Sequence, residues 1–469
     1  MPLCRNILII LQPYKPKNDY LKRWVLPAGY HILNMKKTLI AALMLASAVG
    51  VFAQSGTNSP YSQIGLGLLS DQSTGSSRGM NGLSYGLREH NQVNFSNPAS
   101  YSAVDSLSFI FDVAMSLQAT NFEEKGNKKN ANSAVFEYAV GLFRAAKHVG
   151  VSFGVIPYTA IGYSYFNKNN VNAFPSLESQ NATYTNTYAG TGGTRQVFVG
   201  AGWEPLRGLS VGANVSYLWG DYTKEVVNTY SESAVNTLSK IYKAEVSSYK
   251  LDFGLQYSLD LTKKDNFTLG LAYGLGHELS GDPECDFISS NSQTGVQDSS
   301  IYKVNKGLRI PHTFGAGLLW THANQWKVGV DYQYQKWKNL EWPNLINEGA
   351  ATDYVLQSGQ FNDRHKFTLG GEYCQGERYR GFFRRLHYRA GVSYATPYQK
   401  INGQNGPREL SATLGLGIPI VNNYNNRSVL NISAQWVNLS GNGFLKENTF
   451  RINIGLTFNE RWFAKFKVE

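Results

Sequence analysis

Few residues in this chain have the types and spacing that catalysis or cofactor binding requires. The run from Gly190 to Arg195 (GTGGTR) is faintly similar to a phosphate-binding loop, but it lacks the Lys-Ser/Thr ending and follows no strand-to-helix unit. We therefore expect a flexible extracellular loop there. His312 and His322 lie ten residues apart, which is not a zinc-ligand spacing, and no Ser-His-acid arrangement has a recognisable nucleophile context. The sequence thus predicts no enzyme, no metal and no cofactor.

The clearest pattern is structural and lies near the C-terminus. Every second residue of this stretch is large and apolar, with polar residues or Gly between: Phe450, Ile452, Ile454, Leu456 and Phe458. A period of two places these five side chains on one face of an extended strand. Nine residues is also about the length that crosses a bilayer core as a tilted strand. Any functional residues of this chain must therefore be positioned by strands long enough to cross a membrane.

An export signal lies well inside the chain. Residues 35–37 (MKK) are basic, residues 38–51 form an apolar run, and VFA at 51–53 supplies small residues before Gln54. This is the pattern of a secretory signal peptide, with cleavage predicted between Ala53 and Gln54. The apolar run is too short to remain as a transmembrane helix. We expect residues 1–34 to come from a start codon assigned too early, with translation beginning at Met35.

Removal of the signal changes the charge and the cysteine count. Residues 1–53 contain seven basic residues and one acidic residue, so the net charge falls from +11 to +5. That value does not favour a nucleic-acid partner. Cys4 is removed as well, which leaves Cys285 and Cys374. Two cysteines in an exported chain of this size are not a disulfide framework, and the sequence does not decide whether they pair.

Segments with a period of two recur along the rest of the chain. Fourteen strands are predicted, at residues 107–119, 133–144, 148–166, 193–204, 209–221, 244–258, 266–278, 308–320, 325–337, 364–375, 386–397, 408–419, 428–438 and 449–459. The chain is rich in Gly, Tyr and Phe and only 16% charged, as expected for barrels with aromatic interfacial belts. Only helices and closed barrels satisfy the backbone in lipid. We therefore predict a transmembrane antiparallel up-and-down β-barrel.

The connections between these segments provide an independent indication. The first nine run to about 13, 3, 26, 4, 22, 7, 29, 4 and 26 residues, so that long and short alternate. Outer-membrane barrels have this pattern because short periplasmic turns and long extracellular loops lie on opposite rims. A soluble two-sheet sandwich predicts no such alternation. We expect the protein in the outer membrane of a Gram-negative bacterium.

The segment between the signal and the first strand has a different character. Residues 54–106 are rich in Gly, Ser and Asn and show no sustained alternation. A barrel of fourteen strands is too wide for its own side chains to fill, so we expect a compact plug, or hatch, in the lumen. The predicted parts are therefore an upstream extension (1–34), a signal peptide (35–53), a hatch (54–106) and a barrel (107–469).

The densest basic run falls on a connection that the alternation places on the periplasmic rim. It comprises Arg378, Arg380, Arg384, Arg385 and Arg389, with Tyr379, Phe382 and Phe383 interleaved. In a cytosolic protein such a run favours nucleic acid. In an exported barrel it could bind anionic lipid head groups, with the aromatic rings at the interface. The simpler alternative is a solvated turn.

Three stretches of the mature sequence and its order of elements resemble a known family. The stretches are Arg78 to Gly82 (RGMNG), Asn94 to Leu107 with its Asn97-Pro98-Ala99, and Asn459 to Phe463 (NERWF). Together with the export signal and about fourteen strands, they resemble the FadL/TodX family of outer-membrane transporters, in its Bacteroidota-type members. The resemblance implies a lumen blocked by an N-terminal hatch, with Asn97, Pro98 and Ala99 as the hinge into the first strand.

The resemblance also implies an opening in the barrel wall. In that family a kink in the third strand lets hydrophobic molecules leave sideways into the bilayer. Here the third predicted strand contains Pro157 and Gly162, and Pro lacks the N–H that a strand ladder requires. A local break in the wall is expected at this position. The alternative is that Pro157 only marks where the strand leaves the membrane.

Two functions remain open from the sequence. The first is passive uptake of small hydrophobic compounds, such as fatty acids or aromatics, with hydrophobic molecules or lipids as partners. The second is a non-transporting barrel subunit of a larger outer-membrane assembly, with other outer-membrane proteins as partners. Fold alone does not separate these functions. A transporter requires a continuous apolar path past the hatch, whereas a subunit requires only a plugged barrel.

Overall fold

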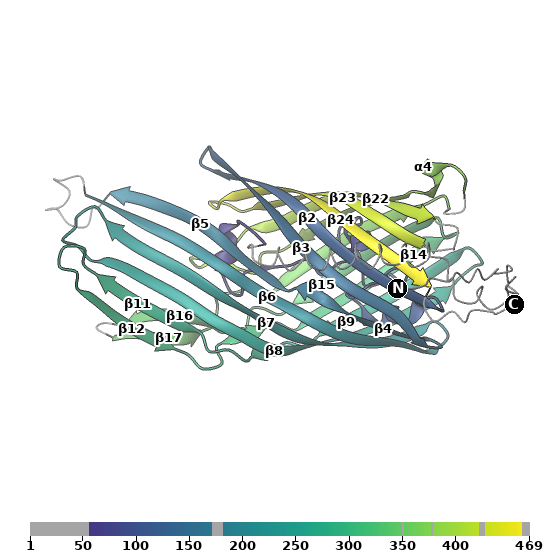
Figure 1. Cartoon of the computed structure of the whole chain (residues 1–469), viewed down its shortest axis with the longest axis horizontal. Helices are drawn as coiled ribbons and strands as arrows, with labels where there is room; N and C mark the ends of the chain where they lie inside the picture. The colour runs from purple at the N-terminus through teal and green to yellow at the C-terminus, as the bar shows by residue number, and fades with distance from the viewer. Residues whose placement is uncertain (1–55, 171–181, 349–350, 377–378, 422–426, 462–469) are drawn as a thin grey trace, which may run out of the picture. The chain divides into compact units, whose positions relative to one another are not determined.

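The computed structural model describes residues 56–170, 182–348, 351–376, 379–421 and 427–461. The predicted upstream extension and signal peptide, including Ala53 and Gln54, lie outside these residues. Among the described residues, no helix has the length and hydropathy needed to cross a membrane. The described chain forms a closed antiparallel sheet preceded by a short irregular segment (Figure 1).

Fourteen antiparallel strands make up the barrel wall. They are β2 (Ser108–Glu124), β3 (Asn127–Ala146), β4 (Val149–Pro157) continued by β5 (Thr159–Asn170), β6 (Thr183–Leu206), β7 (Leu209–Tyr230), β8 (Thr237–Asp260), β9 (Asp265–Gly274), β14 (Thr313–His322), β15 (Trp326–Gln335), β18 (Arg364–Tyr373), β19 (His387–Ala395), β22 (Arg408–Val421), β23 (Arg427–Ser440) and β24 (Lys446–Arg461). The ring closes where β2 pairs with β24, from Ser108 opposite Arg461 to Glu123 opposite Lys446. The predicted fourteen-strand barrel is confirmed.

The segment before the first strand packs against the inner face of the wall. Residues 56–106, called the hatch below, contain η2 (Pro60–Gln63), β1 (Leu68–Leu69), α2 (Gly75–Arg78) and η3 (Pro98–Ala103). Met80, Leu83 and Leu87 are buried together with Leu319 of β14. Val93 and Tyr101 are buried in a second cluster with residues of β2 and β3. The hatch therefore has no hydrophobic core apart from the barrel.

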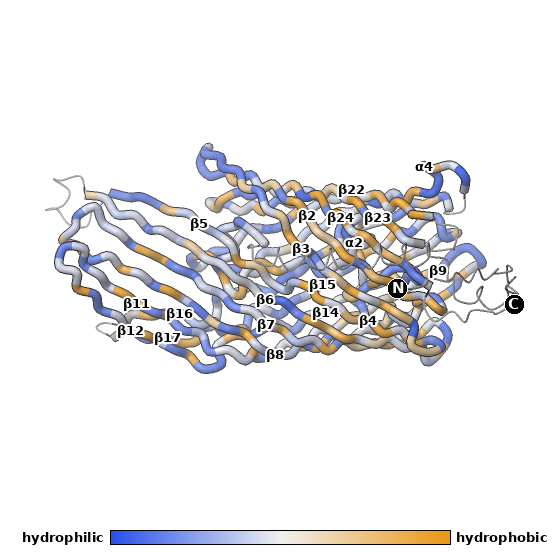
Figure 2. Tube along the Cα trace, in the orientation of Figure 1, coloured by the Kyte–Doolittle hydropathy of each residue, from blue (hydrophilic) through white to orange (hydrophobic). Residues whose placement is uncertain are grey.

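The two faces of the wall differ as the period of two predicts. On β24, Phe450, Ile452 and Ile454 are exposed on the outside, whereas Asn453 is 3% exposed and faces the interior. Figure 2 shows hydrophobic residues recurring along the strands of the barrel. An apolar outer face and a polar inner face are typical of strands that separate lipid from an aqueous or polar lumen.

On the extracellular side, one part of the wall is much taller than the rest. β6, β7 and β8 are 24, 22 and 24 residues long, about twice the 9–11 residues that span a bilayer. β11 (Glu284–Ser290) adds to the upper half of β8, and β12 (Gln297–Lys303) adds to β11. We call this extension of β5–β8 with β11 and β12 the tall wall; it extends to the left in Figure 1.

Three two-stranded sheets and one further helix complete the described structure. They are β10 (His277–Leu279) with β13 (Leu308–Ile310), β16 (Trp342–Glu348) with β17 (Ala351–Gln357), β20 (Lys400–Ile401) with β21 (Gln404–Asn405), and α4 (Phe382–Arg385). Leu279, Leu308 and Ile310 are buried in one cluster with Leu218 and Tyr222 of β7. The tall wall therefore has a hydrophobic layer beneath it. Cys285 and Cys374 are both free.

Several predicted extracellular loops are sheet in the structure. The first connection was predicted to have 13 residues, but in the structure it is the two-residue turn Lys125-Gly126. The reason is that β2 and β3 continue past the apolar band. The predicted connection of about 29 residues between the strands at 266–278 and 308–320 contains β11 and β12. Outside the membrane a strand is solvated on both faces and loses the alternation of apolar and polar residues. The period of two therefore detected only the membrane part of each strand.

We expect Ile454→Arg to abolish barrel assembly and Asn453→Arg to be tolerated. An Arg on the lipid face near the midplane costs roughly 2–4 kcal/mol, and much less in the lumen. Asn453 faces that lumen, beside Ser433, to which it donates a hydrogen bond at 3.2 Å. Heat-modifiable gel mobility of outer-membrane fractions measures the folded barrel. Equal yields of the two variants would contradict the facing assigned to β24.

Candidate functional site

The hydrogen-bonded wall is discontinuous at its third strand. β4 ends at Pro157 and β5 begins at Thr159, and both pieces pair with β6 on one side. On the other side, β3 pairs with β4 only as far as Ala139 opposite Val155. Residues 127–138 of β3 pair with β2 and with no other strand among the described residues. The facing edges of β3 and β5 therefore form no strand ladder with each other. We call this place the β3–β5 gap.

Pro157 lies at the point where the strand is divided. Its ring nitrogen cannot donate a hydrogen bond, and its carbonyl oxygen accepts one from Gln72 Nε2 at 2.8 Å. The next backbone N–H, that of Tyr158, donates to Thr194 O of β6 at 2.8 Å. The strand thus keeps its neighbour on the β6 side and loses it on the β3 side. A role of Pro157 and Gly162 in lateral release stays a prediction.

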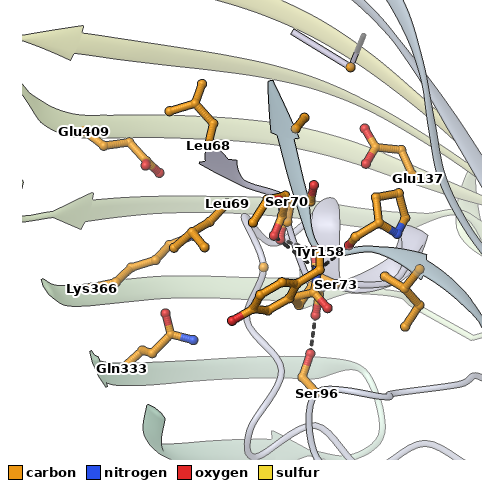
Figure 3. Close-up of a pocket in the computed structure, with 18 of the residues that line it drawn as sticks. Leu68, Leu69, Ser70, Ser73, Ser96, Glu137, Tyr158, Gln333, Lys366 and Glu409 are labelled. Atoms are coloured by element: carbon orange, nitrogen blue, oxygen red, sulfur yellow. Dashed lines mark hydrogen bonds between the residues drawn. The ribbon is translucent and has the colours of Figure 1, made fainter. Parts of the chain in front are cut away.

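The hatch supplies the partners that β3 does not provide (Figure 3). Leu68 and Leu69 form β1, which pairs antiparallel with Ala160 and Thr159 of β5. Ser70 N donates to Tyr158 O at 2.9 Å. Further along the same edge, the Ser62 hydroxyl accepts from Gly162 N at 3.1 Å and donates to Gly162 O at 3.4 Å. The hatch is therefore part of the hydrogen-bond network of the wall.

Asn97, Pro98 and Ala99 lie at the start of η3, packed against the wall. Asn97 is the N-cap, and its Oδ1 accepts from Ala99 N at 3.2 Å, while Pro98 takes the first helical position that suits its fixed φ. Asn97 Nδ2 donates to the backbone oxygens of Leu255 and Leu271, at 3.3 Å each. These residues anchor the hatch to β8 and β9; their predicted role as a hinge stays untested.

The backbone of the hatch lies directly against four glycines of the wall. Gly150, Gly202, Gly212 and Gly254 stand opposite one another on β4, β6, β7 and β8. A methyl group on any of the four would come within 2.4 Å of hatch atoms, from Tyr101 O at Gly150 to Asn97 Oδ1 at Gly254. We call these four residues the glycine row. Their small size lets wall and hatch meet without intervening side chains.

A buried ion pair fixes the middle of the hatch. Arg78 Nη1 lies 2.9 Å from Glu137 Oε2 of β3, and both side chains are almost fully buried. Arg78 also donates to the backbone oxygens of Ser73 and Asp71, at 3.0 Å each. Burial opposes ionisation of the Asp71 carboxyl, but Arg78 and Lys366 nearby lower its pKa below the usual value. Removing one partner of a buried pair leaves an uncompensated charge, which costs several kcal/mol, about 3–5.

A second buried cluster connects the hatch to the opposite part of the wall. Lys327 Nζ bonds to Glu89 of the hatch and lies 3.0 Å from Glu372 Oε1. Arg389 Nε lies 2.6 Å from Glu372 Oε2, and Arg389 Nη1 donates to Asn431 at 2.5 Å. Arg389 therefore belongs to the lumen, whereas Arg380 and Arg384 of the same basic run are exposed. Arg378 lies outside the described residues.

A cavity of about 390 Å³ lies between the hatch and the wall. Its lining includes the ion pairs Lys250–Asp252 and Arg364–Glu409, the latter at 3.1 Å. Lys366 also lines it and points towards the hatch in Figure 3. Sites for hydrophobic ligands are lined mainly by apolar and aromatic side chains. The described lining mixes these charged side chains with apolar and aromatic ones, such as Leu68, Phe95 and Phe198. Among the described residues no cluster of His, Cys, Asp or Glu could hold a metal ion.

The glycine-rich run at 190–195 is strand, which corrects the predicted loop. It lies within β6 and pairs with β7 throughout. Gly192 has φ +121°, and a methyl group there would lie 2.2 Å from Asp221 O. A methyl group on Gly193 would likewise lie 2.5 Å from Thr159 O of β5. Glycine is required here by close backbone approach beside the divided third strand, not by a loop or a phosphate.

We expect deletion of residues 56–90 to leave a barrel that inserts and conducts ions. The deletion removes β1 and Arg78 while it keeps Asn97, which is bonded to the wall. The lumen then loses most of the material that fills it. Planar-bilayer conductance measures the result. Conductance as low as that of the parent protein would mean that other parts of the chain block the lumen.

Gly212→Val should displace the hatch, because the new side chain would meet the Pro98 backbone, 2.4 Å from the position of its Cβ. Overpacking of this kind costs about 1–3 kcal/mol or more. Ala213→Val, on the lipid face of the same strand, is the matched control. Proteolysis of the hatch in detergent should accelerate at least tenfold in the first variant only. Equal protection of both variants would contradict the glycine contacts.

Comparison with solved structures identifies the fold. The toluene transporter TodX of Pseudomonas putida is 16% identical, with a TM-score of 0.57 over 84% of this chain and 100% of that chain. The toluene transporter TbuX of Ralstonia pickettii is 15% identical, with a TM-score of 0.56 over 84% and 99%. A FadL homologue of Pseudomonas aeruginosa is 11% identical, with a TM-score of 0.53 over 84% and 98%. At these identities the likeness shows the fold alone.

The family assignment comes from the sequence as a whole. No curated protein matches the chain. The BamG family matches residues 35–469, which include the hatch and every strand of the barrel. The protein is an outer-membrane β-barrel with a FadL-like fold, and it belongs to the BamG family.

Proposed function

We propose that this protein is a structural subunit of a larger outer-membrane assembly and that its barrel does not conduct hydrophobic compounds. The observation that carries the proposal is the fixed, polar attachment of the hatch. A molecule crossing the lumen would have to displace hatch backbone from the glycine row and separate the Arg78–Glu137 pair. The ion pair is buried, so breaking it leaves two charged groups without partners.

The composition of the lumen supports the same proposal. Uptake of an apolar compound is driven by transfer of its surface from water to protein and then to lipid. The cavity beside the hatch offers Arg, Lys, Asp and Glu side chains along with its apolar ones. An apolar solute gains little from such a lining. This departs from the apolar path that a transporter requires.

Two further features support a place in an assembly. The name of the BamG family points to the BAM complex, which we propose as the host. The tall wall is more sheet than a membrane barrel needs. Val296, just before β12, is 65% exposed, and Ile301, within β12, is 68% exposed. Apolar side chains on a projecting sheet are typical of protein contacts. We propose that partner subunits bind the tall wall.

Extraction in mild detergent tests the proposal. The affinity-tagged protein should co-purify with other outer-membrane subunits in fixed stoichiometry, as measured by quantitative mass spectrometry. Ile301→Asp should reduce the recovered partners at least fivefold, whereas Asn130→Asp, at an exposed position of β3, should leave them unchanged. Recovery of the barrel alone under all extraction conditions would refute the assembly role.

The β3–β5 gap favours a second candidate function, which is passive uptake of small hydrophobic compounds with lateral release. The fold is that of hydrocarbon channels, and the gap lies where β5 depends on the hatch for its partners. Under this alternative, Pro157→Val should close the wall by restoring a backbone donor, and the uptake of labelled toluene or fatty acid by whole cells should fall. Under our proposal, parent cells and deletion cells take up these compounds equally.

A further inference from the structure

The periplasmic connection between β18 and β19 differs from its neighbours on the same rim. Other described connections there are short turns, at residues 147–148, 207–208, 261–264 and 323–325. This one runs from Cys374 to Leu386, is described at 374–376 and 379–386, and contains α4. Figure 1 shows α4 at the rim of the barrel. A connection between adjacent antiparallel strands does not need this length, because two residues are sufficient.

The base of this connection is fixed to the wall. Cys374 N donates to Gln325 O at 2.8 Å, and Gln325 Nε2 donates to Gln375 O at 3.1 Å. On the other arm, Leu386 is 5% exposed, and Arg385 O accepts from Cys374 Sγ at 3.7 Å. The two arms are thus held together at their base, and the described residues 379–384 form a projecting tip.

The tip carries two adjacent phenylalanines on its surface. Phe382 is 50% exposed and Phe383 is 73% exposed, with their ring centroids 5.4 Å apart. The carbonyl oxygen of Phe383 accepts from Tyr388 Oη at 3.1 Å. Tyr388 lies on the outer face of β19, together with Val392, and that face is the one in contact with lipid. The tip is therefore continuous with the lipid-facing surface.

The charges beside the phenylalanines are of one sign. Arg380 and Arg384 are both exposed, and within the described part of the chain neither forms an ion pair with an acidic side chain. Arg side chains place their aliphatic stems along apolar surface and keep their charge at the polar boundary. Apolar rings flanked by unpaired cations match a membrane surface that carries anionic head groups.

We propose that residues 379–384 form a binding site for anionic phospholipids of the inner leaflet. Phe382 and Phe383 insert among the acyl chains at the interface, and Arg380 and Arg384 contact the lipid phosphates. The site holds the periplasmic rim at the level of the head groups. It operates whether the barrel is a subunit of an assembly or a channel, so its test is independent of the proposed function.

Lipid retention tests the proposal on the whole exported protein. The protein is reconstituted in nanodiscs that contain phosphatidylethanolamine and phosphatidylglycerol. It is then released from the nanodiscs in a mass spectrometer, and the phosphatidylglycerol molecules that remain bound are counted. Affinity should fall about fivefold for each arginine removed, so roughly 25-fold in Arg380→Gln/Arg384→Gln. Arg207→Gln is the matched control, since Arg207 is an exposed arginine at a short turn of the same rim. Gel mobility confirms that each variant is folded.

A probe at the tip provides the second measurement. In the Phe383→Cys variant, a fluorescent label is attached to the new thiol. Cys285 and Cys374 are buried, so they do not react with the label. We expect quenching by lipids with brominated acyl chains and little quenching by iodide in the buffer. Phosphatidylglycerol retention equal in parent and double variant would overturn the proposal. Quenching by iodide alone would also overturn it and would indicate a tip that faces water or docks a periplasmic protein.

Discussion

Every backbone N–H and C=O of this protein that lies at membrane depth has to find a partner within the chain, because lipid offers none. Twelve of the fourteen wall strands meet this requirement by pairing with both neighbours. β3 and the third strand do not, because the ladder between β3 and β4 stops at Ala139 and Val155. The hatch provides the partners that the third strand lacks, through Ser62, Leu68, Leu69, Ser70 and Gln72. The hatch thus completes the wall as well as filling the lumen.

The same requirement shapes the interior. A wall that presents an apolar face to lipid presents its other residues inward, and these are polar. Buried polar groups are stable only in complete networks, so the hatch that fills this space is polar as well. Arg78 with Glu137, and Glu372 with Lys327 and Arg389, are the strongest parts of that network. An interior of this kind suits a plug that stays in place, which agrees with the proposed role as a subunit of an assembly.

The sequence predicted those features of the fold that depend on local periodicity. Within the membrane band, alternation as on Phe450 to Phe458 revealed every strand, and Pro157 indicated where the third strand is divided. Above that band both faces of a strand contact water or other sheet layers, so β11, β12 and the upper parts of β6 to β8 show no such period. The run Gly190 to Arg195 was misassigned for a related reason, since close approach of two backbones selects glycine just as a loop does.

The contacts that hold the hatch could not be predicted from spacing. Arg78 and Glu137 are distant in the sequence, and each looks like an ordinary surface residue when read alone. The glycine row was visible only as a high glycine content, because the alignment of Gly150, Gly202, Gly212 and Gly254 depends on strand register. One feature of the sequence did point to these contacts. Each of these glycines lies at a position where the period of two places its residue on the inner face of the wall, and an open pore would have a larger polar residue there.

The seam between β2 and β24 also determines the order of events during biogenesis. It joins residues more than 300 positions apart, so the ring can close only after the last strand has been made, and contacts between such distant residues form late. The hatch is synthesised first, and its backbone ends up enclosed by glycines contributed by four separate strands. The curving sheet therefore closes around the part of the hatch from Asn97 to Tyr101, which the glycine row contacts. A hatch supplied later, as a separate polypeptide, would find the ring already closed.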